Sequence, residues 1–93
     1  GDYEEAIDLF TKVISLKKDS QIAISSLCIR GELHFNLRNF QSALNDLNRV
    51  IDSNYFFPYE STFNLRASAK RKLGDNEGAD EDNKKAEKLK NIL

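Results

Sequence analysis

The sequence is poor in the residues that cross-link small secreted domains. Its 93 residues include one cysteine, one proline, no methionine and no tryptophan. The single cysteine, Cys28, has no partner for a disulfide bond within the chain, whereas stapled secreted scaffolds depend on several such bonds. The sequence therefore does not resemble that class, and its cysteine usage favours a reducing, cytoplasmic compartment.

A long apolar run and an excess of charge of one sign are also missing. No segment approaches the ~20 apolar residues that span a bilayer, and residues 1–5 have neither the basic nor the apolar region of a signal peptide. The 14 Lys and Arg residues nearly balance the 15 Asp and Glu residues, which leaves a net charge of −1. We therefore expect neither a nucleic acid nor a membrane as a partner.

What is present is the composition of an ordinary folded domain. Hydrophobic residues make up 40% of the chain and charged residues 31%, unlike disordered chains, which combine low hydrophobicity with high net charge. A chain of this length encloses one core. It begins without an initiating methionine, directly at a helix-cap pattern, so we expect a piece of a longer protein.

The sequence repeats itself three times. Each copy has a turn residue, then Asp or Asn, then an alanine four residues further on, and the alanines are 37 and 36 residues apart. A short side-chain oxygen at the Asp or Asn position accepts hydrogen bonds from the free amides of a first helical turn, so each copy predicts a helix start. The cap and alanine pairs are Asp2 and Ala6, Asn39 and Ala43, and Asp75 and Ala79.

Apolar residues with helical spacing follow the first two caps. The third copy is more polar, with Asn83 at the place of Phe10 and Leu47. Two further helical stretches cover about 21–37 and 58–73, and Pro58 opens the second at a position where a missing amide has no cost. We predict five helices, with turns near residues 17–20, 37–39, 53–57 and 74.

These units resemble the tetratricopeptide repeat pattern W-x2-L-G-x2-Y…A-x3-F…P. The second unit reads Leu27-x2-Arg30-Gly31-x2-His34 and Ala43-x3-Leu47, with Tyr55 in place of proline. The third reads Phe63-x2-Arg66-Ala67-x2-Lys70 and Ala79-x3-Asn83, and the first supplies only Ala6-x3-Phe10. The resemblance implies an all-α fold, a right-handed superhelical array of antiparallel helix pairs. Residues 1–93 would form one domain: a partial repeat (1–19), a full repeat (20–56) and a terminal repeat with its cap (57–93).

Two features that recur with the units indicate structural roles. Arg30 and Arg66 lie 36 residues apart, which suggests packed aliphatic stems and guanidinium groups that reach a carboxylate or carbonyl. Gly31, Ala67 and the repeated alanines are small, which permits paired helices to cross closely.

In arrays that resemble this one, the first helix of each pair lines a concave groove. Steps of three, four and three residues place the groove-facing side chains on one side of each helix. The resemblance therefore implies a small, polar surface of mixed charge that binds a protein or peptide. Its predicted residues are Ser25, Cys28, Glu32, Phe35 and Asn36 in the second unit and Ser61, Asn64, Ser68, Arg71 and Lys72 in the third.

Two parts of this surface have alternative interpretations. The Phe35 ring is suited to anchor a partner, because buried aromatic side chains dominate binding energies, or it fills the gap between adjacent helices. The basic cluster of Arg66, Lys70, Arg71 and Lys72 is suited to an acidic peptide or a terminal carboxylate. Alternatively, the cluster is solvated and complements the negative end of its helix.

Several specific functions lack the residues they need. Some family members hold the tails of heat-shock chaperones with a clamp of Lys, Asn and Arg, but clamp positions fall here on Ile29 and Leu65. The acidic stretch 75–82 lacks the spacing of a calcium loop. Cys28 has no neighbouring base in sequence, and a lone His34 makes a poor metal site. We therefore predict no enzyme, no cofactor and no metal site.

Two functions remain as hypotheses. The first is a non-catalytic protein–protein interaction module that binds a segment of a partner in the groove. The alternative is a structural cap or a self-association element of a larger protein. That alternative rests on the first helix, which is apolar around more than one face and would complete a core with a preceding helix or with another copy.

Overall fold

The computed structural model describes residues 2–55 and 59–92. All regular structure in this part of the chain is helical, which confirms the predicted all-α class. The described parts of the predicted turns also lie between helices. The predicted helix start at Pro58 lies outside the described residues. The five helices are α1 (Asp2–Leu16), α2 (Gln21–Asn36), α3 (Phe40–Ile51), α4 (Glu60–Lys72) and α5 (Asn76–Ile92).

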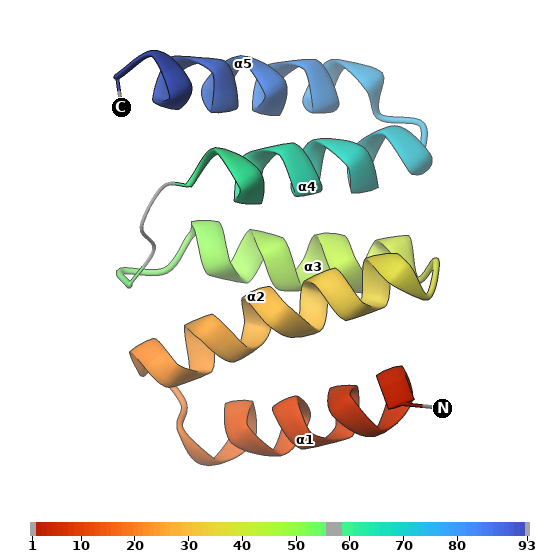
Figure 1. The fold of residues 1–93 in the computed structure, drawn as a ribbon, viewed down its shortest axis with the longest axis vertical. Helices are drawn as coiled ribbons and strands as arrows, with labels where there is room; N and C mark the ends of the chain where they lie inside the picture. The colour runs from red at the N-terminus through yellow and green to blue at the C-terminus, as the bar shows by residue number, and fades with distance from the viewer. Residues whose placement is uncertain (1, 56–58, 93) are drawn as a thin grey trace.

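The helices follow one another along the longest axis of the molecule (Figure 1). The principal-axis extents are 35 × 27 × 17 Å, so the array is elongated and thin. Each helix packs against the next one in the chain, and α2 also touches α4. Short turns join α2 to α3 and α4 to α5, which makes each of these pairs antiparallel.

A side chain caps the start of two of the helices, and one of these two caps was predicted. Asp75 caps α5, because its Oδ1 accepts a hydrogen bond from the Gly78 amide at 2.9 Å. Ser20, which was not among the predicted caps, caps α2 by accepting a hydrogen bond from the Ala23 amide at 3.1 Å. The prediction for Asn39 is wrong: it precedes α3, but its side chain makes no cap hydrogen bond. Its ψ angle of 70° lies outside the extended region that capping side chains need.

The turns that end α2 and α4 have the same backbone design. Arg38, with φ 65°, and Gly74, with φ 89°, both adopt the left-handed conformation. In each turn the following residue donates its amide to a carbonyl five residues earlier, at 2.8 and 2.9 Å. Glycine adopts this conformation freely, whereas a side chain such as that of Arg38 costs roughly 1 kcal/mol.

Small residues bring α2 and α3 close together, as predicted. A Cβ atom added to Gly31 would lie 3.3 Å from the Cβ of Asp46 and 3.4 Å from the Cγ of Leu47. At the corresponding place in the next pair, Ala67 is buried, and its helix α4 packs against α5. Ile14, Leu27 and Val50 form the core cluster that ties α1, α2 and α3 together. The fold thus uses the buried sides of α2 and α4 for packing.

Candidate functional site

The ten residues predicted for the groove lie on α2 and α4. Eight of them are exposed, and the other two, Cys28 and Phe35, are half-buried. We call this set the α2–α4 surface. It comprises Ser25, Cys28, Glu32, Phe35 and Asn36 on α2 and Ser61, Asn64, Ser68, Arg71 and Lys72 on α4.

Phe35 takes part in the packing of its own helix pair. Its ring meets Phe40 of α3 edge to face, with 5.2 Å between the ring centroids and 66° between the planes. The same two rings line a cavity of about 220 Å³ together with Asn36, Arg38 and Lys72. One edge of Phe35 thus supports the helix pair, and another part of it remains open at the surface.

Cys28 lies at a second cavity on the α2–α4 surface. This cavity, of about 190 Å³, is lined by Ser25, Cys28, Tyr55 and Tyr59 among others. Burial raises the pKa of the Cys28 thiol and the negative charge of Glu32 raises it further, against a hydrogen bond with Thr62. The thiol is therefore held in its protonated form and is a poor nucleophile.

Two residues of the α2–α4 surface are engaged by α5. The Asn83 side chain donates to Oδ1 of Asn64 at 2.9 Å, and Arg71 donates to Asp80 at 3.1 Å and to Oδ1 of Asn83 at 2.9 Å. This network lies at the place where Leu47 is fully buried in the preceding pair. The polar third copy of the sequence therefore forms hydrogen bonds where the second copy packs apolar side chains.

Most side chains of the predicted basic cluster form ion pairs within the fold. The Nη2 atom of Arg66 lies 2.7 Å from Asp82, and the Nζ atom of Lys70 lies 2.9 Å from the same carboxylate. These two side chains are therefore neither available to bind an acidic partner nor solvated, so neither predicted interpretation holds for them. Lys72 alone in the cluster is exposed and without an ion pair among the described residues.

Asp82 remains ionised despite its burial. Burial by itself would raise its pKa, but the hydrogen bonds and charges of Arg66 and Lys70 outweigh burial and hold the pKa below its usual range. Its side chain is 1% exposed. A buried carboxylate with two cationic partners is a structural ion-pair site rather than a proton donor.

Arg30 and Arg66 hold equivalent three-helix networks, which confirms their predicted structural role. Arg30 binds Asp46 through two hydrogen bonds of 2.8 and 2.7 Å and donates to Thr11 of α1 at 3.1 Å. Arg66 binds Asp82 with the same two distances and donates to Asn48 of α3 at 3.1 Å. Sequence reasoning missed both aspartates, although they also lie 36 residues apart.

Two other classes of site, a metal centre and a membrane span, are absent from residues 2–55 and 59–92. No group of three or more His, Cys, Asp or Glu side chains there is placed to hold a metal ion. No helix in these ranges is both long enough and apolar enough to cross a bilayer.

The repeated helix pairs, each locked to the preceding helix by an arginine, define a helical-repeat protein. A family model described as tetratricopeptide repeat matches residues 1–20. The chain is 33% identical over 88 residues to heat shock protein STI1 of Saccharomyces cerevisiae, a match that covers 95% of this chain and 14% of that protein. Both matches support a tetratricopeptide repeat protein and, in general terms, a protein–protein interaction module.

Proposed function

We propose that the chain binds a segment of a partner protein along the α2–α4 surface and catalyses no reaction. The observation that supports this most is the exposure of eight of its ten residues on two packed helices. The opposite sides of these helices form the core, so the exposed side has a fixed shape before a partner arrives. Such preorganisation lowers the entropic cost of binding.

The two cavities on this surface suggest what the partner segment looks like. One lies beside Ser25 and the other beside Phe35, ten residues apart on α2, which corresponds to about 15 Å. An extended chain covers that distance with about five residues. The proposed segment therefore carries two apolar or aromatic side chains about five residues apart, one for each cavity.

Substitutions at the two cavities test this proposal. Peptides selected against the protein from a random displayed library are expected to lose at least about tenfold in affinity on Ser25→Arg and on Lys72→Glu. Ser25→Arg fills one cavity, and Lys72→Glu reverses a charge at the other. Both positions are exposed, so the circular dichroism of the variants should match that of the parent.

The matched control is Lys90→Glu, an exposed charge reversal on α5. It should leave the affinity of every selected peptide within about twofold. Full retention of binding by both cavity variants would show that partners dock elsewhere.

A second candidate function is self-association through α1. Leu9 is 62% exposed and Leu16 is 78% exposed, and a spacing of seven residues places them on one side of the helix. Exposed leucines in register are typical of a helix that pairs with another one. If this surface pairs two copies, sedimentation should detect a dimer that Leu9→Glu dissociates. A monomer at high protein concentration would eliminate this candidate.

A further inference from the structure

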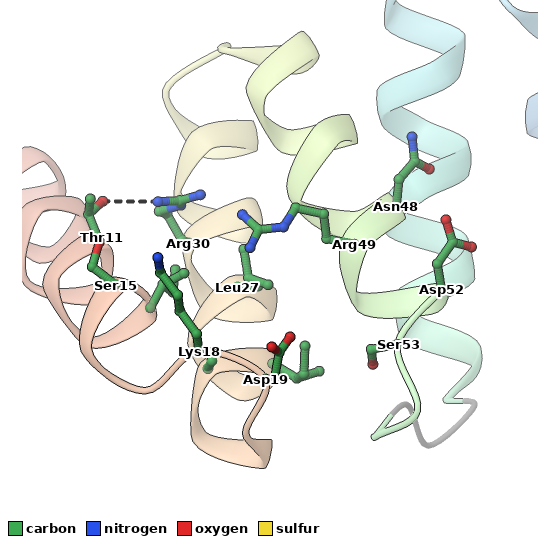
Figure 2. Close-up of a pocket in the computed structure, with 13 residues that line it drawn as sticks. Thr11, Ser15, Lys18, Asp19, Leu27, Arg30, Asn48, Arg49, Asp52 and Ser53 are labelled. Atoms are coloured by element: carbon green, nitrogen blue, oxygen red, sulfur yellow. Dashed lines mark hydrogen bonds between the residues drawn. The ribbon is translucent and has the colours of Figure 1, made fainter.

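A cleft of about 660 Å³ opens between α1 and α3, with α2 as its floor (Figure 2). Within the described residues, no Cα atoms of α1 and α3 approach within 8 Å of each other. Ala23, Leu27 and Arg30 contribute from α2, and Asn48 and Arg49 contribute from α3. The volume lies within the roughly 300–1,000 Å³ of small-molecule sites.

This cleft is separate from the α2–α4 surface. Successive residues of a helix are rotated by about 100°. Leu27 and Arg30 therefore lie on approximately the opposite side of α2 from Ser25 and Glu32. None of the ten residues of the α2–α4 surface lines the cleft, although Ile24 lines both the cleft and the cavity beside Cys28.

The second helix pair shows what occupies the corresponding place. A shift of 36 residues, the shift that relates Arg30 to Arg66, relates Leu27 to Phe63 and Arg49 to Lys85. Phe63 is 8% exposed. The Cζ atom of Arg66 and the Nζ atom of Lys85 each lie 5.8 Å from its centroid. Two cations thus contact one aromatic ring in the second pair, which is a favourable arrangement.

The first pair has the cations without the ring. Leu27 replaces the phenylalanine, and Figure 2 shows the guanidinium of Arg49 reaching over Leu27 toward Arg30. Arg30 is bound to Asp46 and Thr11, as Arg66 is bound to Asp82 and Asn48. In the described part of the chain, Arg49 forms neither an ion pair nor a contact with an aromatic ring.

The charges around the cleft disfavour a simple anion as its ligand. Lys18 adds a third positive charge to those of Arg30 and Arg49, but Asp19 and Asp52 line the same cleft. Asp46 already compensates Arg30. The remaining charges are nearly balanced, whereas anion sites usually concentrate positive charge.

We propose that the cleft between α1 and α3 binds an aromatic side chain of a partner protein, with its ring over Leu27 between Arg30 and Arg49. The ring would take the place that Phe63 occupies in the second helix pair. Ala23, Ile24 and Leu27 form the apolar part of the floor, and Ile24 is the least buried of the three. The two guanidinium groups select an aromatic ring over an aliphatic side chain. This gives the protein a second contact with a partner, on the side away from the α2–α4 surface.

Titration of the isotope-labelled protein with N-acetyl-L-phenylalaninamide tests the proposal by NMR. The amide resonances of Leu27, Arg30 and Arg49 are expected to shift, whereas those of Glu32 and Ser68 should not. Arg49→Gln should weaken this binding by about two- to fivefold, because one cation–π contact is lost. Lys85→Gln is the matched control, since it removes the equivalent cation of the other pair, and it should leave probe binding unchanged.

Leu27→Phe adds an aromatic ring to the cleft from the protein itself. Phenylalanine is the residue found at the equivalent position 63, so we expect the variant to fold, to fill the cleft from within and to reduce probe affinity at least about tenfold. If Leu27→Phe disturbs the fold, Arg49→Gln still decides the question, because Arg49 is exposed.

Three outcomes would overturn the proposal. N-acetyl-L-leucinamide that binds as tightly as the phenylalanine probe would show an unselective apolar cleft. Acetate that produces the same shifts with greater affinity would show an anion site. Shifts of the same resonances on concentrating the protein without a probe would show that a second copy occupies the cleft.

Discussion

Replacing Asp82 with asparagine is expected to lower the free energy of unfolding by about 3 to 5 kcal/mol. The Asp82 carboxylate accepts two hydrogen bonds from Arg66 and lies 2.9 Å from Lys70, and its side chain is 1% exposed. Asparagine keeps the size of the side chain but leaves two cations in the interior without an opposite charge. Since small domains are stable by only about 5–15 kcal/mol, urea denaturation should show a large fall in the transition midpoint.

The equivalent change in the preceding pair, Asp46→Asn, is the matched control. Among the described residues Asp46 pairs with Arg30 and with no second cation, and the Arg30 side chain is 16% exposed, against 9% for Arg66. Water can therefore solvate the unpaired guanidinium, and the loss should be clearly smaller. Equal losses for the two variants would mean that the extra burial and the second cation at Asp82 contribute nothing.

The sequence was sufficient to predict the features that depend on periodicity. The recurrence of Ala6, Ala43 and Ala79 predicted the helix starts, and the repetition of Arg30 and Arg66 predicted a structural role for both. Periodicity works here because each unit packs mainly against its neighbours, so the same position meets the same surroundings. Those surroundings recur in the two arginine networks with nearly identical distances.

Features that depend on contacts between helices were beyond the sequence. Arg71 and Asn64 were placed on the binding surface by their register, and nothing in the register indicates that Asn83 of α5 bonds to both. The cleft between α1 and α3 was also not predictable from the sequence. It is indicated by the difference between Leu27 and Phe63 at equivalent positions, and only the structure shows that two cations contact Phe63. Helix register gives the side of a helix, but not which neighbour reaches that side.

The cap at Asn39 illustrates a local error. Asparagine is among the preferred capping residues, but the residue before it, Arg38, is left-handed, and Asn39 itself has ψ 70°. Ser20 has φ −119° and ψ 162°, an extended conformation that brings its hydroxyl to the Ala23 amide. The turn geometry therefore decided which side chain capped its helix, and composition alone did not.

Leu47→Ala is expected to destabilise the protein by about 2 to 5 kcal/mol. Leu47 is 0% exposed and packs beside Gly31, where α2 and α3 cross closely. Truncation leaves a cavity that this rigid crossing cannot close, because its backbones are already at contact distance. Thermal and urea denaturation followed by circular dichroism measure the loss.

The loss on Leu47→Ala is to be compared with the loss on Asn83→Ala, because Asn83 occupies the same position in the next pair. Asn83 is exposed, and its hydrogen bonds to Asn64 and Arg71 are open to water. Exposed hydrogen bonds of this kind contribute little, so the expected loss is about 0.5 kcal/mol or less. Similar losses at positions 47 and 83 would contradict the view that the third copy replaced apolar packing with surface hydrogen bonds. A large difference would show that one repeat position is a core residue in α3 and a solvated one in α5.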